Sequence, residues 1–177
     1  MDPDHLDIYG TAENVEQAFI DFSTRVKDGG LLLSKFGLSR TPALKASHHL
    51  TYHLNDVKAN VCAANITMNN GSYRFDVIYK NAVAISWKLN EVELNMGGMH
   101  NIENMIAAIA VAHHLNIEDE KIKAAVSSFK GVKRRFEYIV KNEKQIFIDD
   151  YAHHPDELKA LLTGAKKLFP DKKCTII

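Results

Sequence analysis

The stretch that decides the fold of this chain is IFIDDYAHHP, residues 146–155. Its apolar start predicts a buried strand, and Pro155 suits the first turn of a helix, because the N–H that proline lacks would be unpaired there. Two acids, a tyrosine and two histidines separate the strand from the helix. Ligands of open α/β sheets bind at the carboxyl ends of the strands. The stretch therefore predicts an α/β fold with a ligand site over residues 149–154.

The residues on either side continue this pattern. A strand is expected over residues 136–140, a polar turn at 141–143, and a second strand over 145–150. Apolar residues then recur at helical spacing over 155–169, and residues 174–177 are expected to begin another buried strand. The C-terminal part of the chain thus reads as the start of a separate α/β unit, with a boundary near residues 131–135.

Upstream of this unit, helical and extended segments are mixed. Thr11 is expected to cap a helix, and residues 31–34 read as a short buried strand. Residues 50–94 lack helical spacing and predict an antiparallel region, with a hairpin turn at Asn69-Asn70-Gly71 because Asn-Gly tolerates the positive φ values of a type I′ turn. Two apolar stripes at helical spacing follow, over 102–110 and 122–129. The expected inner face of the first helix consists of Val15, Ala18, Phe19, Phe22 and Val26.

The composition is that of a folded globular chain and excludes two classes of partner. Of the 177 residues, 46% are hydrophobic and 25% are charged, enough to bury a core. The 22 Lys and Arg residues balance the 22 Asp and Glu residues, so no net field attracts nucleic acid or an anionic membrane. The longest apolar runs are too short to span a bilayer, and no signal peptide pattern opens the chain. We expect neither nucleic acid nor a membrane as a partner.

Two motifs in the first two thirds of the chain could bind a nucleotide or its metal. His5 lies close to two aspartates, which suits Mg²⁺ or Mn²⁺, although a polar loop before the first helix is the plainer interpretation. Asn101 and Asn104 lie one helical turn apart, so their carboxamides are expected to face the same way. A carboxamide offers a donor and an acceptor, which complements the N6 and N7 edge of adenine. On spacing alone, an ordinary helix cap is the better explanation of these asparagines.

Two further motifs flank the expected start of the C-terminal unit. Arg135 ends a basic run, and its planar fork of donors suits phosphate oxygens, although most short basic runs are solvated turns. Asp150, at the end of a strand, is a natural partner for ribose hydroxyls, and His153-His154 offers acid/base or metal chemistry. The alternative is that one of the two acids only caps the next helix.

Taken together, these motifs resemble the Mur ligase family over essentially the whole chain. Residues 98–108 read GMHNIENMIAA, which is similar to the adenine-recognising helix start of the family, while GVKRRFE at 131–137 and DDYAHHP at 149–155 are similar to its hinge. The resemblance implies that residues 1–131 form the later part of the central ATP-binding domain and residues 132–177 the start of a Rossmann-like C-terminal domain. No glycine-rich loop of the P-loop type occurs in the sequence. We therefore expect a piece of a longer enzyme that is inactive alone.

The resemblance also implies a role for each candidate residue. His5 helps to hold Mg²⁺ near the transferred phosphoryl group and Arg135 reaches the phosphates of ATP, so both are expected to be catalytic. The other expected nucleotide contacts are His100, Asn101, Asn104 and Asp150, the last of them at the ribose. The residues expected to face the amino-acid and nucleotide-sugar substrates are Tyr151, His153 and His154.

The activity implied is that of a cytoplasmic amino-acid ligase of peptidoglycan synthesis that uses ATP and Mg²⁺. ATP would phosphorylate the carboxylate of UDP-N-acetylmuramate, and the amine of L-alanine would displace phosphate from the resulting acyl phosphate. Tyr9 and Tyr151 resemble the alanine-adding members more than the members that recycle murein tripeptide. Tripeptide recycling stays an alternative, as does an adenine-nucleotide binding module with no catalysis.

Overall fold

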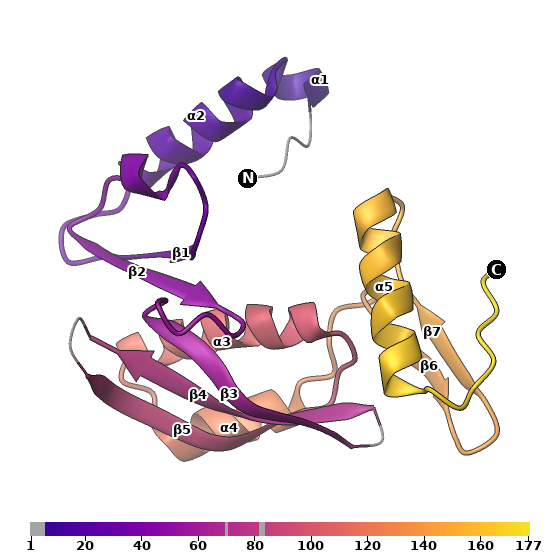
Figure 1. Cartoon of the computed structure of the whole chain (residues 1–177). Coiled ribbons are helices and arrows are strands. Elements are labelled where there is room, and N and C mark those ends of the chain that lie inside the picture. The colour runs from indigo at the N-terminus through magenta and orange to yellow at the C-terminus, as the bar shows by residue number, and fades with distance from the viewer. Residues whose placement is uncertain (1–5, 70, 82–83) are drawn as a thin grey trace.

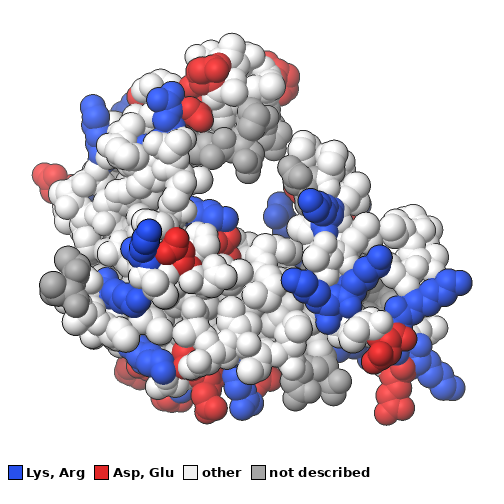
Figure 2. Space-filling view, viewed as in Figure 1, with Lys and Arg blue, Asp and Glu red and all other residues white. Residues whose placement is uncertain are grey.

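The computed structural model describes residues 6–69, 71–81 and 84–177. His5, Asn70 of the predicted turn and Val83 of the predicted antiparallel region therefore lie outside the described residues. Figure 1 shows a larger N-terminal part built on one sheet and a smaller C-terminal part beside it. The α/β class expected from the sequence is confirmed, with an antiparallel subregion in the larger part. Acidic and basic side chains intermix on the face drawn in Figure 2, in keeping with the balanced composition.

The larger part contains a five-stranded sheet in the order β1-β2-β3-β4-β5. Its strands are β1 (Leu31–Lys35), β2 (His48–His53), β3 (Val61–Asn69), β4 (Ser72–Lys80) and β5 (Ile85–Leu94). β4 is antiparallel to both of its neighbours, β3 and β5, as expected. β2, however, runs parallel to both β1 and β3. The antiparallel prediction is wrong for residues 50–53, which belong to β2. β2 pairs with β3 only through Tyr52 and His53, and the loop between the two strands returns the chain so that β3 runs in the same direction as β2.

The hydrophobic core lies between this sheet and two helices, α3 (Met99–His114) and α4 (Asp119–Ser128). Figure 1 shows both helices against one face of the sheet. The first stripe predicted from the sequence is confirmed, since Ile102, Ile106 and Ile109 of α3 are buried. The second is only partly right: Ile122 and Val126 of α4 are buried, but Ala125 is exposed, and Phe129 is 39% exposed because α4 ends before it, at Ser128. Burial of this face sets the orientation of α3, whose first turns carry several of the candidate site residues.

Two helices open the described chain, and a short 3-10 helix separates the first two strands. They are α1 (Leu6–Tyr9), α2 (Ala12–Ser23) and η1 (Thr41–Ala43). Thr11 caps α2 as expected, because its hydroxyl oxygen accepts the N–H of Asn14 at 3.3 Å. β1 is less buried than the sequence predicts, since it is the edge strand of the sheet. None of the described helices is long and apolar enough to cross a membrane.

The inner face predicted for α2 is partly wrong. Phe19 is 51% exposed and Phe22 is 72% exposed, whereas Ile20 and Ser23 are buried. The loop after η1 lies against this other side, where Ser23 Oγ accepts the N–H of Lys45 at 2.8 Å. Helical spacing identified the helix but carried no information about which neighbour covers it.

The C-terminal part consists of β6 (Glu137–Lys141), β7 (Ile146–Asp149) and α5 (Pro155–Leu168), with β6 and β7 antiparallel. These elements agree with the predicted strands, turn and helix. The strand predicted over residues 174–177 is wrong, because these residues are exposed and form no strand. A strand needs a neighbour to satisfy its backbone groups, and none of the described strands pairs with this segment.

Candidate functional site

Phe136 joins the two parts of the molecule. It lies just before β6, is 2% exposed, and packs its ring against the loop before α3. A Cβ atom on Gly97 would lie 1.9 Å from Phe136 Cε1, so only glycine fits at that position. On the α5 side, a Cβ atom on Gly164 would lie 3.7 Å from Phe136 Cε2. The phenyl ring therefore brings the start of α3, the segment before β6 and α5 together at one place.

The backbone of this hinge, residues 131–136, is held in an unusual conformation. Arg134 and Phe136 have φ values of 58° and 51°, a region that residues other than glycine seldom adopt. Arg134 N donates to Glu137 Oε2 at 2.8 Å, and Phe136 N donates to Asp150 Oδ2 at 2.7 Å. Tyr151 N donates to Arg134 O at 2.7 Å. Backbone strained in this way clusters at functional sites, and this segment lines a cleft.

The cleft has a volume of about 320 Å³ and lies where these segments meet. Most of the predicted site residues line it: His100, Asn101, Asn104, Arg135, Asp150 and Tyr151. The lining residues that the sequence did not single out are Arg134, Ala152, Glu157, Ala160 and Leu161. A second hollow, of about 410 Å³, is formed by the single exposed turn at residues 142–145 and gathers no such groups.

The two asparagines at the start of α3 are not presented alike. Asn101 Nδ2 donates to Gly97 O at 2.6 Å, so one of its donors is used within the chain. The exposed Asn104 makes no hydrogen bond through its side chain to another of the described residues, although it lines the cleft. Asn104 therefore has both its donor and its acceptor free for a ligand, and Asn101 has only part of its capacity.

His100 lies in the same turn of α3. Although the residue as a whole is exposed, its ring lies over Gly98, where a Cβ atom would be 2.6 Å from His100 Cε1. Desolvation by the surrounding protein lowers the pKa of His100; the Asp150 carboxylate opposes this shift, and the Arg135 guanidinium adds to it. With its pKa below the usual value, the imidazole is mostly neutral at pH 7 and can both donate and accept a hydrogen bond.

Asp150 ties the hinge to the end of β7. Its Oδ2 accepts the N–H of Phe136 at 2.7 Å, and its Oδ1 accepts the N–H of Ala152 at 2.8 Å. The helix-cap alternative does not apply to Asp150, because the N-cap of α5 is His154. Each carboxylate oxygen can accept more than one hydrogen bond, so Asp150 retains capacity for a hydroxyl ligand.

The loop after β7 is exposed and hydrogen-bonded to the start of α5. Tyr151 is 58% exposed, and the Arg134 guanidinium lies 4.8 Å from its ring centroid. Glu157 accepts the N–H groups of His153 and His154 at 3.2 and 3.3 Å, and these bonds lower the pKa of Glu157. Neither His153 nor His154 is among the residues that line the cleft. Glu157 could have been found from the sequence, because it stands three residues after His154, the spacing of a capping box.

The predicted metal ligand is not among these groups, because His5 lies outside the described residues. Within residues 6–69, 71–81 and 84–177, no group of three or more His, Cys, Asp or Glu side chains could hold a metal ion. The donors that the structure describes therefore do not by themselves fit a bound Mg²⁺.

Two segments of the chain match known protein-domain families. Residues 1–112 match the Mur ligase middle domain, and residues 134–177 match the domain described as Mur ligase, glutamate ligase domain. The chain belongs to the Mur ligase family. Its cleft is lined from both matched segments, by α3 in the first and by the hinge, the loop after β7 and α5 in the second. The site therefore forms where two Mur ligase segments meet.

Two curated relatives of this Mur ligase chain have the same name. The UDP-N-acetylmuramate–L-alanine ligases of Cytophaga hutchinsonii and Porphyromonas gingivalis are 37% and 39% identical to it, over 100% and 97% of its length. Each match covers 37% of the relative, so the chain spans little more than a third of these proteins. Among solved structures, the UDP-N-acetylmuramate-alanine ligase of Thermotoga maritima has a TM-score of 0.75 and 26% identity, covering 97% of this chain and 37% of that one.

Proposed function

We propose that this chain is the hinge-containing part of an ATP-dependent ligase that adds L-alanine to UDP-N-acetylmuramate in cytoplasmic peptidoglycan synthesis. Relatives at 37% and 39% identity bear the name of that enzyme. The observation that carries the proposal is the cleft of about 320 Å³, which gathers the predicted nucleotide contacts. In this proposal, residues 1–131 belong to the central ATP-binding domain and residues 132–177 to the C-terminal domain.

Each side chain of the cleft suits one part of ATP. The free carboxamide of Asn104 suits the N6 and N7 edge of adenine, with His100 and Asn101 in the same turn of α3. Asp150 suits the ribose hydroxyls, which would donate to its carboxylate. Arg135 lines the cleft, and its guanidinium has no ion pair within the described residues, so its five donors are free for phosphate oxygens.

The proposed reaction has two steps. An oxygen of the muramyl carboxylate attacks the γ-phosphorus of ATP, which releases ADP and forms an acyl phosphate. The amine of L-alanine then attacks the acyl carbon, loses a proton and forms the amide bond as phosphate leaves. This chain would hold the nucleotide across the hinge and offset negative charge with Arg135. Tyr151, His153 and His154 are proposed to face the amino acid and the nucleotide sugar.

The substrate assignment is tested on the full-length protein that carries this chain. We expect phosphate release from ATP to require both UDP-N-acetylmuramate and L-alanine, with an amide product formed in equal amount. Release that occurs with murein tripeptide but not with L-alanine would favour the recycling ligase instead. ATP binding without release under either condition would favour a non-catalytic nucleotide-binding module.

The proposed magnesium role of His5 rests on the family resemblance and has its own test. In the full-length protein, His5→Ala is expected to raise the Mg²⁺ concentration needed for half-maximal activity and to lower kcat, because one ligand of the ion is lost. The thermal unfolding midpoint should stay unchanged. His48→Ala, which alters a histidine on β2, is the matched control. An unchanged magnesium requirement would contradict this role and would favour the alternative that His5 is only part of a polar loop.

A further inference from the structure

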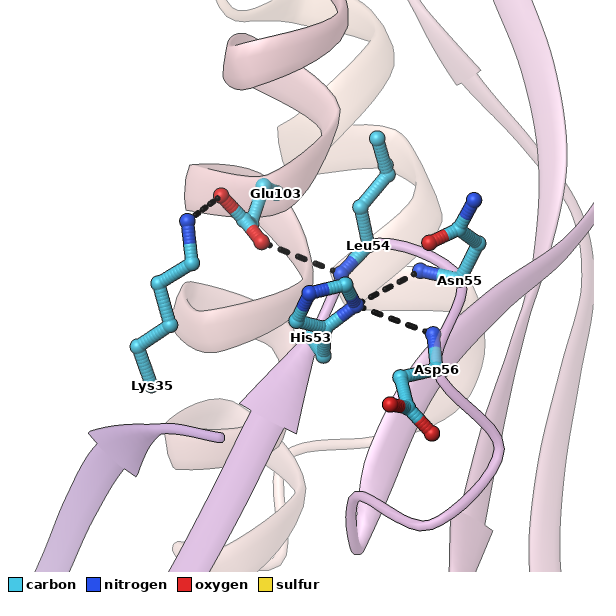
Figure 3. Close-up of polar contacts among 6 residues, drawn as sticks. All are labelled: Lys35, His53, Leu54, Asn55, Asp56 and Glu103. Atoms are coloured by element: carbon cyan, nitrogen blue, oxygen red, sulfur yellow. Dashed lines mark hydrogen bonds and ion pairs between the residues drawn. The ribbon is translucent and has the colours of Figure 1, made fainter. Parts of the chain in front are cut away.

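Glu103 fastens the start of α3 to the ends of two strands (Figure 3). Its Oε2 lies 2.8 Å from Lys35 Nζ, and its Oε1 accepts the N–H of Leu54 at 3.1 Å. Lys35 is the last residue of β1, and Leu54 directly follows β2. One carboxylate thus joins the beginning of a helix to the carboxyl ends of two parallel strands.

The backbone that Glu103 contacts is itself held in place. His53 Nδ1 accepts the N–H groups of Asn55 and Asp56 at 3.3 and 2.9 Å, which closes the turn around Leu54. The Glu103 side chain is only 16% exposed, so water competes little for its two contacts. A shielded carboxylate that is bonded through both oxygens constrains the helix more than an exposed ion pair would.

The start of α3 depends on such a constraint because its own cap is weak. The N-cap is Gly98, with a φ of 88°, and glycine has no side chain to accept from the first N–H groups of the helix. Asn101 makes one further contact, to Gly97 O. Asn104 follows Glu103 directly in the sequence and lines the cleft, so a shift of this turn would move its carboxamide.

We propose that Glu103 is a positioning residue that sets where the Asn104 carboxamide lies in the cleft and thereby contributes to the choice of adenine over guanine. The inference rests on the proposed nucleotide role of this site. Glu103 acts through α3 and not on the ligand, because its oxygens are engaged by Lys35 and Leu54. Base choice is the decisive readout, because guanine carries an acceptor where adenine carries its amino donor.

The test is a double-mutant cycle on ATP and GTP affinity in the full-length protein. Glu103→Ala is expected to weaken ATP binding roughly 3- to 30-fold and to lower the preference for ATP over GTP. With Asn104→Ala already present, the same change should add little, because the position of a missing carboxamide no longer matters. Glu103→Gln keeps an acceptor for the N–H of Leu54 and should restore most of the affinity.

The matched control is Glu16→Ala, which breaks the 2.6 Å ion pair between α2 and Arg40 and should leave both affinities unchanged. Equal weakening of ATP and GTP by Glu103→Ala, or a loss that adds in full to that of Asn104→Ala, would overturn the inference, because Glu103 would then only stabilise the fold. If Glu103→Ala does not fold, Lys35→Met removes one of the two contacts and should lower the ATP preference to a smaller extent. A parent protein without ATP preference would overturn the inference and the proposed function together.

Discussion

Replacing Arg135 with alanine is expected to lower the kcat of the proposed ligase reaction in the full-length protein roughly 10²- to 10³-fold, the effect of removing one preorganised donor from a developing charge. Arg135 lines the cleft and has no ion pair within the part of the chain that the structure describes. It lies between Arg134 and Phe136, whose strained backbone gives the hinge a defined shape. Phosphoryl transfer depends on positioning and charge stabilisation, so the loss should fall on kcat more than on the KM for ATP.

Arg134 provides the matched control for this experiment, in which steady-state phosphate release is measured. Its guanidinium already lies 4.8 Å from the Tyr151 ring centroid and 3.8 Å from Asp149 Oδ2. Arg134→Ala should therefore change kcat by less than about tenfold, as expected for exposed contacts worth about 1 kcal/mol or less. Arg135→Lys keeps the charge without the fork of donors and should recover only part of the rate. Equal losses in the two alanine variants would mean that the basic run acts as a diffuse charge.

Local spacing was enough to predict most helices and strands of this chain. The stripe of α3 could be read directly, because burial of one helix face leaves a period in the sequence. The predictions for α2 and for residues 174–177 failed because local spacing does not show which other segment packs against or pairs with an element. Phe19 and Phe22 face outward because the loop at Lys45 covers the other side of α2. Residues 174–177 form no strand because no described strand pairs with them.

The candidate site shows the same division between local and distant information. Asn104, Arg135 and Asp150 stand in short contiguous motifs, so they could be named from the sequence, and the structure brings them to one cleft. Their individual roles stay predictions. Glu103 could not be named in this way, because its partners Lys35 and Leu54 are distant in the sequence and meet it only once α3 packs on the sheet.

The second large effect is expected for Asp150→Ala, which should weaken ATP binding to the full-length protein by roughly 1–3 kcal/mol for each hydrogen bond lost. The change removes two functions together. Asp150 accepts the N–H groups of Phe136 and Ala152, and the loss of these bonds should loosen the hinge and weaken all nucleotides alike. Asp150 is also proposed to accept the ribose hydroxyls, and the loss of that contact should weaken only nucleotides that carry them. Asp149→Ala, which removes the partly exposed neighbouring acid, is the matched control.

The measurement that tests the proposed nucleotide site most directly compares the affinity of ATP with that of 2′,3′-dideoxy-ATP, which lacks both ribose hydroxyls. The full-length parent and its Asp149→Ala variant are predicted to prefer ATP by the same ratio. In Asp150→Ala, this ratio is predicted to fall close to one, whatever the change in absolute affinity. A ratio that survives Asp150→Ala would contradict the proposed site, because Asp150 would then hold only the hinge and would not bind the nucleotide from the C-terminal side.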